Sequence, residues 1–118
     1  MTAKSRALLA GVACAVAAVI APTGAGAAAT RSCAPIENPY AGTRYEGADL
    51  RGIRATGVSC ATARRVVRGA HRKALGQTPP PSGVRHLTWN GWRVTGDLRG
   101  DSDRYTARRG SRRVRWVF

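Results

Sequence analysis

The stretch GVSCATARRVVRGAHRKALG, residues 57–76, decides the fold because its apolar positions recur at the spacing of an amphipathic helix. Ser59 can cap this helix, and the run QTPPPSG at residues 77–83 ends it and forms a proline-rich linker. The apolar stripe covers an arc of about 120° and is built of small residues, which are Cys60, Ala63, Val66, Val67, Ala70 and Ala74. Such a stripe predicts a helix lying close against a sheet, whereas a membrane-lytic helix carries a broad face of Leu, Phe or Trp.

The segments on both sides of this helix alternate between apolar and polar residues, which is typical of β-strands. A short strand around Ile53 and Ala55 precedes the helix, and antiparallel strands at residues 92–95, 104–108 and 113–118 follow the linker. We therefore predict an α+β fold in which one amphipathic helix packs on a small antiparallel sheet. One face of this sheet is apolar and aromatic, so that Trp92 and Trp116 belong to the core, and the other face carries arginines.

Residues 1–29 have the pattern of a secretory signal peptide. Lys4 and Arg6 precede an uncharged apolar run at residues 7–20, and small residues that suit signal peptidase occupy positions 25–29. The run is shorter than the roughly 20 residues that a membrane-spanning helix needs. We therefore expect a secreted or extracellular protein whose single small basic domain covers residues 30–118, and Cys14 is removed with the signal.

Two cysteines, Cys33 and Cys60, remain after this cleavage, and an exported chain is expected to pair them. Closing a loop of this length stabilises a domain by about 3.5 kcal/mol in the loop-entropy treatment. The disulfide would fix the segment at residues 30–47, which has no periodicity and is predicted to be an extended arm. The cysteine and histidine spacings do not complete a tetrahedral site, so we expect no metal and no cofactor.

Positive charge is the strongest functional signal in the sequence. Of the 20 basic residues only Lys4 and Arg6 leave with the signal, whereas all 6 acidic residues stay, so the mature chain carries a net charge of +12. Such a field favours contact with polyanions. The predicted basic surfaces are the outer side of the helix and the polar face of the sheet, with residues Arg64, Arg65, Arg68, Arg72, Arg93, Arg104, Arg113 and Arg115.

The stretch IRATGVSCATARRVVRGAH, residues 53–71, resembles a motif of small secreted proteins from high-G+C Gram-positive bacteria, in which R-x-x-G-x-S-C-x-x-A ends a strand and opens a helix. A C-terminal hairpin of the form W-R-C … C-R-R-G-x-R-x-V-R-F completes that pattern. The matching residues include Ser59, Cys60, Ala63, Gly110, Val114 and Arg115. The resemblance spans residues 50–118 and implies an α+β architecture and export, without implying a reaction.

The chain departs from this pattern at Val94 and Ala107, which stand where the group has a second cysteine pair. Both lie on the apolar side of their strands. The apolar face of the sheet therefore stays apolar, but a stabilising disulfide is lost.

Candidate catalytic residues are few. His71 and His86 could serve a secreted ribonuclease by acid–base chemistry if both reached one cleft. The simpler interpretation makes His71 a packing residue of the helix and lets His86 open a strand, so no catalytic residue is assigned. The tripeptide Arg99-Gly100-Asp101 resembles an adhesion motif but is better explained as a turn, and the role of Trp89 stays open.

Two classes of function follow from these observations. The first is a non-enzymatic, monomeric binding module for wall polymer, anionic lipid or nucleic acid outside the cell. The alternative is a small secreted hydrolase such as a ribonuclease, or a hydrolase inhibitor. A third possibility is that the positive charge of the domain only keeps it soluble.

Overall fold

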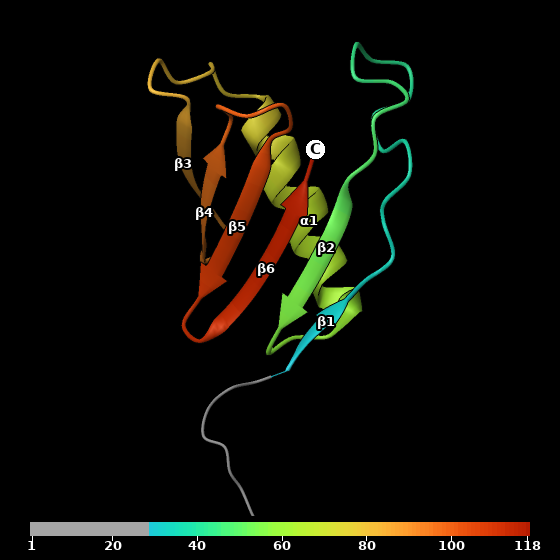
Figure 1. Cartoon of the computed structure of the whole chain (residues 1–118), viewed down its shortest axis with the longest axis vertical. Coiled ribbons are helices and arrows are strands. Elements are labelled where there is room, and N and C mark those ends of the chain that lie inside the picture. The colour runs from blue at the N-terminus through green and yellow to red at the C-terminus, as the bar shows by residue number, and fades with distance from the viewer. Residues whose placement is uncertain (1–28) are drawn as a thin grey trace, which may run out of the picture.

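The computed structural model describes residues 29–118, so the signal peptide expected over residues 1–29, with Cys14, lies outside the described residues apart from its last position. Six antiparallel strands form one sheet in the order β1-β2-β6-β5-β4-β3, and one helix crosses a single face of this sheet (Figure 1). The elements are β1 (Thr30–Ser32), β2 (Arg51–Thr56), α1 (Cys60–Leu75), β3 (Val84–Trp89), β4 (Trp92–Asp97), β5 (Arg104–Arg109) and β6 (Arg112–Val117). The predicted α+β fold is confirmed.

Helix α1 forms where the apolar spacing predicts it. The Ser59 side chain accepts a hydrogen bond from the backbone N–H of Thr62 at 3.1 Å, which satisfies a free donor of the first turn. All of the predicted stripe except the partly exposed Cys60 is buried, and His71 extends the stripe with no exposed surface. The helix ends at Leu75, before the irregular linker at residues 77–83.

The inner face of the sheet, which we define as the face covered by α1, holds the core. Trp92 and Trp116 are almost fully buried, as predicted, and the Trp116 ring stacks on Tyr105 with 5.2 Å between ring centroids. Val94 and Ala107 lie directly opposite each other on β4 and β5, and both are buried. The inner face is therefore apolar at these two positions.

Trp89, whose role the sequence left open, lies against the helix. A Cβ atom added to Gly69 would stand only 2.0 Å from the Trp89 ring, so the absence of a side chain at Gly69 makes room for the indole. Trp89 is partly buried and packs on the edge of the core. Its ring is thus a packing element between β3 and α1.

The segment at residues 30–47 starts as an extended chain, because β1 pairs with β2 and a bridge joins Ile36 to Leu50. The predicted Cys33–Cys60 disulfide is present, with 5.4 Å between the Cα atoms, and ties this segment to the first turn of α1. Residues 38–47 then form turns that bring Tyr40 and Tyr45 against Phe118. The segment is therefore held to the domain at a few points, while most of its side chains are exposed.

Among residues 29–118, Arg85 is the one arginine or lysine that the fold buries, with 7% of its surface exposed. It lies on the inner face of β3, where its guanidinium donates to the backbone carbonyl of Ala74. The Gln77 carbonyl accepts a second bond at 3.4 Å. Arg85 thus caps the negative C-terminal end of α1 and does not contribute to the basic surface.

Candidate anion-binding face

The outer face of the sheet, which we define as the face opposite α1, is an arginine surface. Residues alternate between the two faces of a strand, so each inward apolar residue leaves its neighbours pointing outward. Six arginines from four strands lie on this face, and these are Arg54, Arg93, Arg104, Arg108, Arg113 and Arg115. Four were predicted as site residues, and Arg54 and Arg108 follow from the same alternation.

The strand register places these arginines directly opposite one another. Arg113 on β6 faces Arg108 on β5, which in turn faces Arg93 on β4. We call these three residues the arginine row. In the neighbouring row Arg54 on β2 faces Arg115 on β6. Like charges in directly opposite positions destabilise a sheet, so this arrangement costs stability in the absence of an anion.

Among the described residues, no carboxylate stands opposite the arginine row or the Arg54–Arg115 pair. Within residues 29–118 the only ion pair joins Arg99 to Asp97 at 2.9 Å. None of the six arginines of the outer face takes part in it. Asp97 ends β4 opposite Arg104. The other acidic residues lie in the segment at residues 33–50 or in the β4–β5 connection, and they are Glu37, Glu46, Asp49, Asp101 and Asp103. Both segments lie at the end of the sheet toward which β4 and β6 point, whereas the arginine row lies near the opposite end (Figure 1).

Shallow hollows lie between the arginine side chains. One of about 200 Å³ is lined by Thr30, Arg54, Thr56, Arg113 and Arg115, which come from β1, β2 and β6. A second of about 170 Å³ shares Thr56 and Arg113 with the first and adds Arg108 and the β5–β6 turn. The outer face therefore offers indentations in which guanidinium groups surround an open space.

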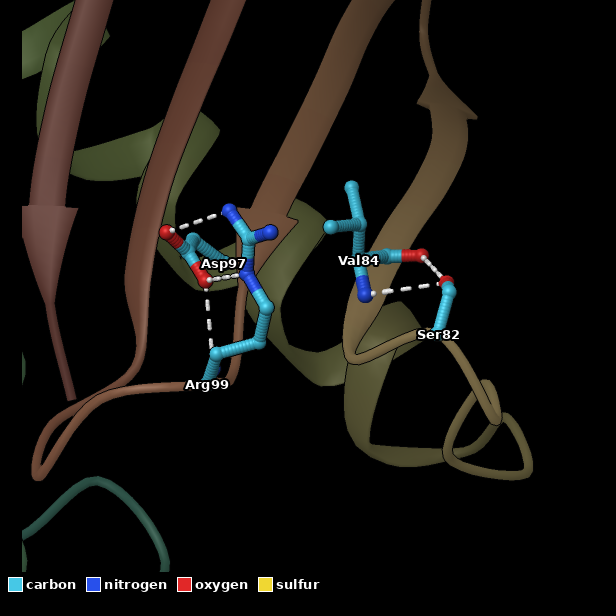
Figure 2. A network of polar contacts seen from close by, with 4 residues as sticks. All are labelled: Ser82, Val84, Asp97 and Arg99. Atoms are coloured by element: carbon cyan, nitrogen blue, oxygen red, sulfur yellow. Dashed lines mark hydrogen bonds and ion pairs between the residues drawn. The ribbon is translucent and has the colours of Figure 1, made fainter.

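The Arg99-Gly100-Asp101 turn is not presented as an extended adhesion motif. Figure 2 shows the Arg99 side chain folded back onto the carboxylate of Asp97, with Nε donating to Oδ1 at 2.9 Å and Nη2 to Oδ2 at 3.2 Å. These hydrogen bonds hold the pKa of Asp97 at about 2, well below its usual range. Just before β3, the Ser82 hydroxyl bonds both backbone groups of Val84 and closes a turn (Figure 2).

The outer side of α1 forms a second, less uniform basic surface. Arg65, Arg68 and Arg72 are exposed. Arg64 is only partly exposed, and its Nη2 donates to the carbonyl of Pro35 at 3.3 Å, so it anchors the N-terminal segment. Because α1 covers the inner face, this surface and the arginine row lie on opposite sides of the molecule.

The structure separates the two histidines. His71 is fully buried on α1, where Nδ1 shares a hydrogen bond of 2.7 Å with the Tyr40 hydroxyl and the ring lies 4.3 Å from that of Phe118. Burial, assisted by the positive charge of Arg85, lowers the pKa of His71 to about 4. His86 is exposed on the outer face of β3. The two side chains therefore lie on opposite faces of the sheet and do not share a cleft.

Residues 29–118 contain no group of three or more His, Cys, Asp or Glu side chains that could hold a metal ion. Among the described helices, none has the length and apolar character needed to cross a bilayer. No protein-family model, curated protein or solved structure matches this chain.

Proposed function

We propose that this protein is a secreted, non-enzymatic binding module for extracellular polyanions and that the outer face of the sheet is its binding surface. The observation that carries the proposal is the arginine row together with the Arg54–Arg115 pair, in which like charges stand opposite each other without a carboxylate partner. A bound polymer of phosphate or similar groups would neutralise these charges and relieve their repulsion. The ligand thus supplies the counter-charge that the fold lacks.

Export of the chain is part of this proposal. The N-terminal pattern of a signal peptide supports it, and so does a disulfide that an oxidising compartment would preserve. The mature protein is expected to begin near Ala28 or Thr30 and to be two hydrogens lighter than its reduced form. Intact mass measured with and without reductant tests both statements. A secreted chain that retains Met1 would contradict the first, and a mass that does not change on reduction would contradict the second.

The binding test compares two triple variants that remove the same charge. Arg93→Gln, Arg108→Gln and Arg113→Gln empty the arginine row, whereas Arg65→Gln, Arg68→Gln and Arg72→Gln neutralise the exposed side of α1. Affinity for duplex DNA, used as a reporter polyanion, is measured across a range of salt concentrations. Six contacts with phosphates predict a log–log slope of about −5 for the wild type, and loss of three contacts predicts about −3.

The affinities of the two variants show which surface binds the polymer. If the outer face binds the polymer, the sheet variant loses most of its affinity and the helix variant stays close to the wild type. Equal losses in both variants would mean that only net charge matters. A wild type that is not retained by DNA, anionic vesicles or wall polymer even at low salt would refute the proposal.

The same samples test the alternative of a hydrolase. RNA is incubated with the wild type and with the His71→Ala and His86→Ala variants, and turnover is followed over time. Because the two histidines lie on opposite faces of the sheet, we expect no histidine-dependent cleavage. Cleavage that either substitution abolishes would overturn the non-enzymatic proposal.

A further inference from the structure

We propose that the hollow between β1, β2 and β6 binds a terminal phosphate monoester of the polyanion, an inference that rests on the proposed function. The five residues that line it are Thr30, Arg54, Thr56, Arg113 and Arg115, and we call this space the terminal-phosphate hollow. In it, three guanidinium groups surround two threonine hydroxyls that are hydrogen-bonded to each other. The following features of the described residues support this assignment.

The side chains around the terminal-phosphate hollow are suited to donate hydrogen bonds to an anion. A guanidinium carries five N–H donors and no acceptor, and no carboxylate or amide side chain lines the space. Arg54 and Arg115 are opposite each other in the register, and Arg113 is opposite Thr56. A metal cation would meet only positive charge here, whereas a tetrahedral oxyanion could accept bonds from several directions.

The two hydroxyls add a donor that the arginine row lacks. The Oγ1 atoms of Thr30 and Thr56 are 2.7 Å apart, so the proton of one hydroxyl is used in the bond between them. The second proton remains free for a ligand, and the bond that its oxygen accepts makes it a stronger donor. Thr30 and Thr56 are paired in register, which fixes the two oxygens side by side.

The charge of the terminal-phosphate hollow favours the end of a polymer over its interior. A phosphate monoester carries a charge of about −1.5 to −2 at neutral pH, whereas each phosphodiester within a chain carries only one negative charge. Three clustered guanidinium groups are balanced better by the monoester. The terminal group of a polymer thus gains more from this site than any internal phosphate does.

The register also gives the polymer a direction. Thr30, Thr56 and the arginine row occupy consecutive positions across β1, β2, β6, β5 and β4. Neighbouring strands are about 4.8 Å apart, so a polymer lying across the strands would meet one side chain after another. Its internal phosphates would contact the arginine row, and its end would reach the terminal-phosphate hollow.

The test uses two short oligonucleotides of one sequence, with either hydroxyl groups or phosphate groups at both ends. We expect the wild type to bind the phosphorylated form about tenfold more tightly, the effect of one additional charge-assisted hydrogen-bond set. The Thr30→Val and Thr56→Val double variant should lose this preference, because it removes both hydroxyls while keeping the charge and the β-branched shape. Thr88→Val and Thr95→Val, on the same face but outside the hollow, form the matched control and should retain the preference.

Each outcome bears on one proposal. If the wild type binds both oligonucleotides equally, or if the Thr30→Val and Thr56→Val variant keeps the preference, the terminal-phosphate hollow is refuted while the binding face stands. If the wild type binds neither oligonucleotide at low salt, the proposed function itself fails. Titration of the folded wild type with methyl phosphate provides an independent check, because the backbone resonances of Thr30 and Thr56 should shift first. Glycerol phosphate and a nucleoside monophosphate, used as competitors, identify whether the phosphate on a polyol or on a nucleotide fits better.

Discussion

Acid should destabilise this protein through one buried side chain, His71. The ring has no exposed surface and lies among Tyr40, Tyr105, Trp116 and Phe118, with Nδ1 bonded to the Tyr40 hydroxyl and Nε2 without a hydrogen-bond partner. Burial among these rings disfavours the charged imidazolium, and Arg85 adds a repulsive positive charge, so that the pKa falls to about 4. The folded state therefore holds the neutral form.

The sign of the effect follows from the two protonation equilibria. In the unfolded chain His71 titrates near its ordinary pKa of 6.5, whereas in the folded protein it titrates near 4. Between these values the unfolded state binds more protons, so the free energy of unfolding falls as the pH decreases. Relative to pH 7, the expected loss from this residue is about 2 kcal/mol at pH 5 and about 3 kcal/mol at pH 4.

Chemical denaturation of the wild type and of His71→Phe at pH 7, 5 and 4 tests this reasoning. The variant keeps an aromatic ring in the cluster but cannot take up a proton. Asp103, whose pKa is raised by burial, acts in the opposite direction, so the readout is the difference between the two proteins.

A packing variant such as Val66→Ala serves as the control, because it loses stability at every pH and should keep the wild-type acid response. If His71→Phe loses stability on acidification as steeply as the wild type, the assignment of a buried neutral His71 is wrong.

Two further predictions concern packing. Gly69→Ala should destabilise the protein by about 1 to 2 kcal/mol, because the clash with the Trp89 ring outweighs the gain in helix propensity. In a Trp89→Ala background the same substitution should stabilise it, and thermal unfolding of the four proteins shows whether the sign changes. Val94→Cys with Ala107→Cys should form a second disulfide, because opposite residues in an antiparallel pair have Cα separations within the disulfide range. The gain should be about 2 kcal/mol after the loss of the Val94 side chain, and rapid alkylation of both new thiols in the folded protein would contradict the pairing.

Much of the fold could be predicted because local pattern and tertiary structure agree. The spacing of small apolar residues gave α1 and its buried side, and alternation gave the faces of β2, β4, β5 and β6. The Cys33–Cys60 pairing followed from cysteine count and export. Alternation assigns a residue to a face but does not say which residue stands opposite it. The arginine row therefore became visible only with the strand register.

Other features depend on contacts between distant residues. Tyr40 and His71 are 31 positions apart, and the segment that carries Tyr40 has no periodicity that would place it. For Arg85 a signal did exist, since it alternates with Leu87 on the inner side of β3. A charged residue is nevertheless expected to be exposed, and only the nearby end of α1 explains its burial. Arg64 is only partly exposed for a similar reason, because its guanidinium donates a hydrogen bond to the carbonyl of Pro35 in the N-terminal segment.

The position of β6 constrains the order in which this chain can fold during synthesis. β6 is the last strand along the described sequence, yet it lies between β2 and β5 in the sheet. Until the ribosome has released residues up to Val117, the early half with β1, β2 and α1 has no sheet partner for β2 on that side. The hairpins β3–β4 and β4–β5 can form from neighbouring residues, but closing the domain requires contacts between distant parts of the chain. The nascent protein should therefore stay incompletely folded until the C-terminal strand emerges, a state that a translocation channel for unfolded chains could accept.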